Sequence, residues 1–273
     1  MYLAIDIGGS KTLLACFDSG GKVIASEKFK TPHVYDKFLT ELAKTVANLS
    51  TKKFIAVGVA IPGKVDRKTG VGLAFGNLPW QNVPVKKDIE KMMDCKVYIE
   101  NDANLAGLSE ARLIPEFNRV LYVTISTGIG GVIVNKGKID EGTQDAEIGH
   151  ILLEYGGRLV RWEDFASGKA IVEKFGKKAS EIDPDDSKTW YVIARNIAIG
   201  LIDIIATLTP DVIIVGGGVG THLPKYQDRL NEELKIYENP LIKIPPILSA
   251  KRPEEAVIYG CYELVRDKHG STS

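Results

Sequence analysis

Two short glycine-turned hairpins constrain the fold of this chain more than any other feature of its sequence. Each begins with an apolar run of strand character, reaches a Gly-rich turn with a hydroxyl residue beside it, and continues at once into a second apolar run. The two segments span residues 3–12 and 121–131. Glycine lets the backbone approach an anion closely, and successive turn N–H groups can form a concave anion site. The repeated pattern therefore predicts two similar lobes whose turns face one polyphosphate.

Two better-known glycine motifs fit the sequence poorly. Ser10 stands directly before Lys11 and Thr12, where a P-loop requires glycine. The glycine run at 216–220 follows an apparent strand, but Thr221 occupies the place of the last glycine in the dinucleotide-binding fingerprint. An ordinary hairpin or helix-capping turn explains any one of these runs taken alone. The occurrence of one pattern in two places favours the phosphate interpretation.

The composition favours an enzyme that acts on small molecules. The chain has 273 residues, enough for one large domain or two of ordinary size. Acidic and basic residues number 35 each, so the net charge gives no global attraction to nucleic acid or to an anionic membrane. Three scattered cysteines without CxxC spacing, and an N-terminus without a signal segment, indicate a cytoplasmic protein. No apolar run approaches the roughly 20 residues that span a bilayer.

The spacing of apolar residues predicts an α/β chain. An antiparallel meander is expected up to residue 29, and further strands are expected over 54–61, 96–99 and 211–215. Helices are expected over 36–49, 85–93, 103–112, 189–207, 224–236 and 253–266. The last of these helices can pack back on the first lobe.

Polar residues follow the strand expected at 96–99. The segment Glu100-Asn101-Asp102-Ala103-Asn104 places a carboxylate and an amide at a strand-to-helix junction. Asn offers a donor and an acceptor to vicinal hydroxyls, and Asp can accept a hydroxyl proton as a general base. An isolated Asn or Asp before a helix is more often an N-cap, and these residues alone leave both interpretations open.

Three further residues have side chains suited to a ligand. Glu147 and His150 lie three positions apart and can face the same way toward a sugar or a metal. No Cys or His cluster lies close by to complete a tetrahedral zinc site. Asp6 ends the first strand beside the glycine turn, where its charge would repel a phosphate. A Mg²⁺ ion between the two would resolve this conflict.

The order of these motifs resembles that of the ROK family of sugar kinases, within the actin, Hsp70 and hexokinase-like ATPase superfold. The resemblance rests on the segments Asp6–Thr12, Ala60–Gly63, Asn77–Trp80, Glu100–Asn104, Ser126–Gly131, Glu147–His150, Glu163–Gly168 and Val215–Gly218. It implies a two-lobed α/β fold in which each lobe is a ribonuclease-H-like βββαβαβα repeat. The implied lobes are a smaller one over 1–103, joined by a C-terminal helix at about 254–273, and a larger one over 104–253. The active site is expected in the cleft between them.

The resemblance also implies the role of each residue. Asp102 is the general base that activates the 6-hydroxyl of a hexose for attack on the γ-phosphoryl group of ATP. The implied sugar contacts are Gly63, Asn77, Asn101, Asp102, Glu147, His150 and Glu163. The implied ATP contacts are Gly8, Gly9, Lys11, Thr12, Thr127, Gly128, Gly130, Gly217 and Gly218. Asp6 is expected to hold Mg²⁺ through water or phosphate. The expected partners are a hexose, ATP and a second copy of the chain, without nucleic acid or membrane.

One departure from the family concerns its zinc motif. Most members carry C-x-C-G-x-x-G-C between the His and the later Glu, with that His as a further ligand. Here the three cysteine positions hold Glu154, Gly156 and Arg161. We therefore expect a zinc-free member in which His150 contacts the sugar.

The sequence leaves the identity of the sugar substrate open. Glucose is the leading candidate, which would place the protein in glycolysis, and N-acetylmannosamine, N-acetylglucosamine and fructose are the alternatives. Sugar-responsive repressors of the same family carry a helix-turn-helix segment before the first phosphate motif. Asp6 lies only six residues from the start, which disfavours a repressor. A chaperone or filament protein of the same superfold would leave the sugar-side residues without a role.

Overall fold

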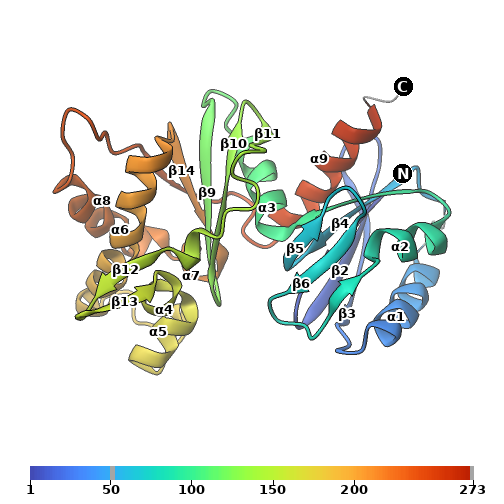
Figure 1. Ribbon diagram of the computed structural model, residues 1–273, viewed down its shortest axis with the longest axis horizontal. Helices are drawn as coiled ribbons and strands as arrows, with labels where there is room; N and C mark the ends of the chain where they lie inside the picture. Colours follow the sequence, from blue (N-terminus) through green and yellow to red (C-terminus); the bar gives the residue numbers. More distant parts are fainter. Residues whose placement is uncertain (50–52, 271–273) are drawn as a thin grey trace. The chain divides into compact units, whose positions relative to one another are not determined.

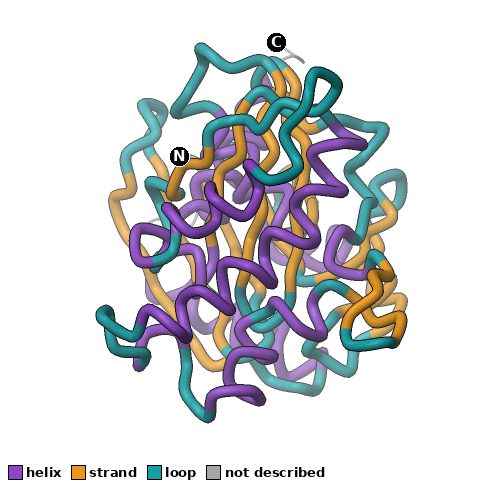
Figure 2. Tube along the Cα trace, turned by 90° about the vertical axis from the view of Figure 1, so that its left-hand side faces the viewer, coloured by secondary structure: helices purple, strands orange, loops and turns teal. Residues whose placement is uncertain are grey.

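A computed structural model describes residues 1–49 and 53–270 and divides the chain into two compact units (Figure 1). Unit 1 contains Met1–Ser109 and the C-terminal segment from Glu255, and unit 2 contains Glu110–Glu254. Figure 2 marks the helices and strands of both units by colour.

Unit 1 is built on a five-stranded sheet with the strand order β3-β2-β1-β4-β8. The strands are β1 (Tyr2–Ile7), β2 (Lys11–Phe17), β3 (Val23–Lys30), β4 (Ala56–Ile61) and β8 (Lys96–Asn101). The first three strands form an antiparallel meander, and β4 and β8 run parallel to β1. The carboxyl ends of β1, β4 and β8 therefore lie at one edge of the sheet.

Helices cover both faces of this sheet. They are α1 (Tyr35–Asn48), α2 (Val85–Met93), α3 (Asp102–Ala111) and α9 (Ala256–Gly270). Side chains alternate along β1, so Leu3 and Ile5 belong to the core cluster with α1 and α2, whereas Ala4 packs with α9 and with Leu105 of α3. The C-terminal helix is therefore part of unit 1.

A small three-stranded sheet follows β4, in a stretch where the sequence analysis predicted no strand. It consists of β5 (Gly63–Asp66), β6 (Val71–Phe75) and β7 (Gln81–Val83), in that order. Strands of three to five residues carry too little alternation to be recognised, and their pairing depends on Gly63. This glycine has φ +155°, and the Ala74 carbonyl leaves no room for a Cβ atom there.

Unit 2 repeats the strand order of unit 1. Its sheet runs β11-β10-β9-β14-β15, formed by β9 (Arg119–Ile125), β10 (Ile129–Asn135), β11 (Lys138–Ile139), β14 (Val212–Gly216) and β15 (Ile247–Ser249). Again three antiparallel strands come first and two parallel strands follow. This repetition confirms the duplicated α/β fold that the two hairpins predicted.

The remaining elements of unit 2 surround its sheet. The helices are α4 (Glu163–Ala166), α5 (Gly168–Phe175), α6 (Ser187–Leu208), α7 (Gly217–Gly220) and α8 (Gln227–Lys235). Short 3₁₀ helices lie at η1 (Ile148–His150), η2 (Ala179–Glu181) and η3 (Leu223–Lys225), and β12 (Leu152–Tyr155) pairs with β13 (Arg158–Arg161) in a separate hairpin. The helix expected over 224–236 is interrupted at Tyr226, which leaves the helical region (φ −132°) and stacks its buried ring on Trp190.

The helix α6 is the one helix within residues 1–49 and 53–270 that is long and apolar enough to cross a membrane, judged by length and composition alone. Half of its apolar window is buried. Trp190, Ile197 and Leu201 lie in the core cluster of unit 2. We therefore interpret α6 as a core helix.

Candidate functional site

The first glycine turn joins β1 to β2 in unit 1. The Gly8 amide donates a hydrogen bond to the Lys11 carbonyl over 3.0 Å and closes the turn. A Cβ atom on Gly9 would lie 2.6 Å from the Cβ of Asn77, which is closer than such atoms approach in proteins. Glycine at this position therefore lets Asn77, an expected sugar contact, lie directly against the expected phosphate turn.

Thr12 supports this turn from inside the fold. Its side chain is fully buried, and its Oγ1 lies 2.9 Å from Oγ1 of Thr31. Thr31 donates its own proton to the Gly8 carbonyl over 2.7 Å, so Thr12 is the donor to Thr31. The structure thus places Thr12 beneath the turn, whereas Lys11 beside it is exposed.

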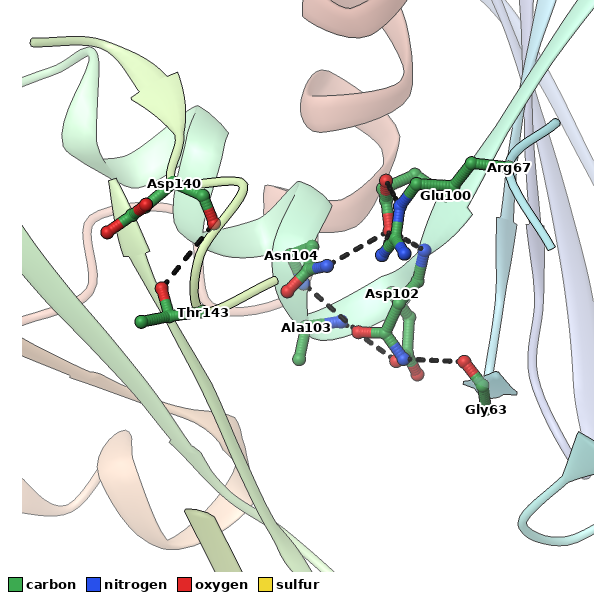
Figure 3. Close-up of polar contacts among 9 residues, drawn as sticks. Gly63, Arg67, Glu100, Asp102, Ala103, Asn104, Asp140 and Thr143 are labelled. Atoms are coloured by element: carbon green, nitrogen blue, oxygen red, sulfur yellow. Dashed lines mark hydrogen bonds and ion pairs between the residues drawn. The ribbon is translucent and has the colours of Figure 1, made fainter. Parts of the chain in front are cut away.

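The junction of β8 and α3 carries the predicted base. Asn101 is the N-cap of α3, because its Oδ1 accepts from the Asn104 amide over 3.1 Å. Its Nδ2 donates to the Gly63 carbonyl over 3.0 Å. Asp102 is the first residue of the helix, and its Oδ1 accepts from the Ala103 amide over 2.8 Å (Figure 3). The capping role suggested by the sequence therefore belongs to Asn101.

A buried ion pair that the sequence did not reveal underlies this junction (Figure 3). Arg67 donates to Glu100 through two nitrogens, from Nε to Oε2 over 2.7 Å and from NH2 to Oε1 over 2.6 Å. Oε1 of Glu100 also accepts from the Asn101 amide and from Nδ2 of Asn104. Glu100 is only 5% exposed. A charged residue at the end of the apolar strand was the one available signal, since its partner lies 33 positions away.

Asp6 lies one residue before the end of β1, at the same edge of the sheet. Burial and, to a smaller extent, the Asp102 carboxylate raise the pKa of Asp6 to about 7, and Lys11 acts in the opposite direction. Two carboxylates that interact in this way fit a divalent cation, which would relieve their repulsion. Mg²⁺ is commonly held by one or two carboxylates together with substrate phosphates.

The raised pKa of Asp6 predicts a pH-dependent effect of Asp6→Asn. The unfolded carboxyl has a pKa of about 3.9, so the folded protein binds more protons between about pH 4 and pH 7, and ionisation of Asp6 lowers its stability as pH rises. In EDTA, we expect the variant to be more stable than the wild type at pH 8, on the order of a few kcal/mol, and the difference to shrink toward pH 5. Thermal unfolding of the variant and the wild type at both pH values measures this difference in stability. Asp228→Asn, an exposed change on α8, is the control, and an advantage that did not vary with pH would contradict the prediction.

The second glycine turn joins β9 to β10 in unit 2. The Ser126 amide donates to the Gly128 carbonyl over 2.9 Å, and the Ser126 carbonyl accepts from Gly168 at the start of α5. A Cβ on Gly128 would lie 2.7 Å from Oε2 of Glu163, and the same oxygen accepts from the Ile129 amide over 3.4 Å. An expected sugar contact therefore touches an expected phosphate turn in this unit as well.

His150 also meets Glu163. Its Nε2 lies 3.2 Å from Oε1 of Glu163. The neighbouring Gly149 packs against the Ile129 carbonyl with no space for a Cβ atom. Glu147 lies just before η1, with its carbonyl accepting from the His150 amide and its side chain exposed. The structure thus brings His150 to Glu163, and no described contact joins the Glu147 side chain to them.

Two of the other expected nucleotide contacts, Gly130 and Gly217, lie near Thr124. Gly130 pairs with Thr124 in the β9–β10 ladder. Gly217, with φ +78°, follows β14, and its Cβ would lie 2.7 Å from Oγ1 of Thr124. Gly218 faces open space, and Thr127 is exposed at the tip of the hairpin. The carboxyl ends of β9 and β14 thus bring both glycine segments together.

The residues at the three cysteine positions of the zinc motif lie on the β12–β13 hairpin. Gly156 and Gly157 form its two-residue turn with positive φ angles of 62° and 80°, and the Gly157 amide donates to Oε1 of Glu154 over 2.7 Å. Across residues 1–49 and 53–270, no group of three or more His, Cys, Asp or Glu side chains is arranged to hold a metal. The absence of zinc stays a prediction.

The repeated strand order, with a glycine turn after the first strand of each unit, defines a two-lobed ATPase fold of the actin-like class. The ROK family model matches residues 2–268. The chain belongs to the ROK family.

Individual relatives differ in the sugar that their names give. The N-acetyl-D-glucosamine kinase of Histophilus somni is 30% identical, over 97% of this chain and 98% of the relative. A ROK family glucokinase from Streptomyces griseus, solved in complex with glucose and AMPPNP, is 26% identical with a TM-score of 0.82, over 97% and 99% of the two chains. The ROK hexokinase of Thermus thermophilus is 28% identical with a TM-score of 0.80 and the same coverage.

Proposed function

We propose that this protein is an ATP-dependent sugar kinase. Its proposed substrate is the hexose glucose, which it phosphorylates at the 6-hydroxyl group. One observation carries the proposal for the catalytic residue. Asp102 follows the carboxyl end of β8 and interacts with Asp6, which adjoins the Gly8–Gly9 turn. A carboxylate base thus lies near a turn suited to phosphate.

In the proposed reaction Asp102 removes the proton of the sugar hydroxyl as its oxygen attacks the γ-phosphorus of ATP. The new bond joins the sugar oxygen to phosphorus, the bond to the β-phosphate oxygen breaks, and ADP leaves. Phosphoryl transfer depends mainly on positioning and charge neutralisation. Mg²⁺ bound with ATP, and held by Asp6, would supply part of that neutralisation.

The residues proposed to bind the sugar fall into two groups. The Asn101 amide is fixed by its bonds to Gly63 and Asn104 and still has one donor and one acceptor position for a hydroxyl. His150 and Glu163 offer a second polar pair, and Glu147 and Asn77 complete the proposed set. We propose that ATP is bound by the two glycine turns together with Lys11, Thr12, Thr127, Gly130, Gly217 and Gly218.

N-acetyl-D-glucosamine is the second candidate substrate. The observation in its favour is the 30% identity with a kinase named for that sugar. The two sugars differ only at carbon 2, so the contacts to that carbon decide between them.

An ADP-release assay with glucose, mannose, fructose, N-acetylglucosamine and N-acetylmannosamine tests the proposal. NMR of each product identifies the phosphorylated oxygen, and reactions without sugar or with EDTA are the controls. We expect the highest kcat/KM with glucose and a 6-phosphate product. A preference for an N-acetylated sugar would move the substrate to the second candidate, and no turnover with any sugar would refute the kinase proposal.

The family resemblance also supports a homodimer, and the scattered cysteines without CxxC spacing favour the cytoplasm as its location. With glucose as its substrate, the protein would act in glycolysis. Light scattering coupled to size-exclusion chromatography tests the oligomeric state directly.

A further inference from the structure

We propose that Arg161 is a positioning residue that fixes the Glu163 carboxylate for sugar binding, an inference that rests on the proposed function. Arg161 ends β13, and Glu163 begins α4. The NH1 group of Arg161 lies 3.0 Å from Oε1 of Glu163. Because α4 is a single turn of four residues, the helix alone holds this side chain weakly. The guanidinium supplies the missing constraint.

Arg161 is itself fixed by Asp164. Its NH2 and Nε groups donate to the two carboxylate oxygens of Asp164 over 2.7 Å and 3.2 Å. The Arg161 amide donates to Oδ2 of Asp164 as well. This bidentate pair uses two guanidinium nitrogens and sets the plane of the group. The third nitrogen, NH1, is thereby directed at Glu163.

The backbone between the two residues is anchored by Trp162. This side chain is fully buried in the core of unit 2. Its amide donates to the Ile151 carbonyl over 3.0 Å, and its indole Nε1 donates to the Asn196 carbonyl over 3.1 Å. Arg161 and Glu163 therefore project from a segment that cannot shift without opening the core.

The two carboxylate oxygens of Glu163 have different contacts. Oε1 lies within 3.0 Å of Arg161 and 3.2 Å of His150 Nε2, so protein donors occupy it. Among residues 1–49 and 53–270, Oε2 lies beside Gly128 and accepts a long hydrogen bond of 3.4 Å from the Ile129 amide. A sugar hydroxyl would accordingly donate to Oε2, on the side of the glycine turn.

Kinetics of Arg161→Met test this inference, with Arg158→Met as the matched control. Arg158 is exposed on the same hairpin strand. With the sugar that the wild type phosphorylates fastest, we expect the sugar KM of Arg161→Met to rise about tenfold, which corresponds to about 1.4 kcal/mol. The KM for ATP should stay within roughly twofold of the wild type. The sugar KM of Arg161→Lys should fall between the values of the wild type and Arg161→Met, because an ammonium group cannot replace the planar guanidinium that contacts both carboxylates.

A double-mutant cycle with Glu163→Gln separates positioning from general stability. If Arg161 acts through Glu163, adding Arg161→Met to Glu163→Gln raises the sugar KM no further. Equal sugar KM values for Arg161→Met and Arg158→Met, or additive effects in the cycle, would overturn the proposal while leaving the kinase function intact. A wild-type protein without turnover on any sugar would refute the proposed function, and this inference with it.

Discussion

We expect Asp102→Asn to lower kcat by about 10²–10⁴-fold, the range that general-base catalysis contributes, while the sugar still binds. Asn keeps an oxygen that can accept from the Ala103 amide, so the start of α3 is preserved. It cannot take up the proton of the attacking hydroxyl. Steady-state kinetics measure the loss of turnover, and calorimetry with the sugar alone measures the retained binding.

Asp228→Asn on the exposed side of α8 is the matched control for this change and should leave kcat unaltered. A second readout comes from Asp6. Because the Asp102 charge raises the pKa of Asp6, that pKa should fall in the variant, as followed by ¹³C NMR of the carboxyl group. Full turnover in Asp102→Asn would remove this residue from the base role.

Glu100→Gln is expected to cause the largest loss of stability among the changes considered. The substitution removes the charge that Arg67 faces and turns an amide donor toward its guanidinium. Breaking a buried ion pair from one side costs about 3–5 kcal/mol, and we expect about 3 kcal/mol because Arg67 retains 25% exposure. Urea denaturation measures the loss, and hydrogen exchange locates it at β8 and α3.

An exposed pair provides the control for this prediction. Glu41 and Lys44 on α1 are 41% and 68% exposed, so Glu41→Gln should cost less than about 0.5 kcal/mol. Adding Arg67→Met to Glu100→Gln removes the guanidinium that would otherwise face a neutral amide, and it should recover part of the stability. Equal stability of Glu100→Gln and Glu41→Gln would show that the buried pair contributes no more than a surface pair.

Most regular elements could be predicted from the sequence because their signals are local. The helix expected at 85–93 is observed as α2 with the same bounds, and α6 lies within two residues of its expected ends. The sheet β5–β7 and the hairpin β12–β13 escaped prediction, since their strands are only three to five residues long. Their pairing is fixed by turns and by contacts with the rest of each unit.

The duplication, the two glycine turns and the polar residues at the end of β8 could all be predicted from the sequence, because each depends on residues that are neighbours in the chain. The pairing of the charged groups depends on the tertiary structure. Arg67 reaches Glu100 across 33 positions, and His150 meets Glu163 only after the hairpin between them folds back. The raised pKa of Asp6 likewise follows from burial and from Asp102 at the start of α3. Such contacts arise from packing between segments, and no local pattern encodes which partners packing will bring together.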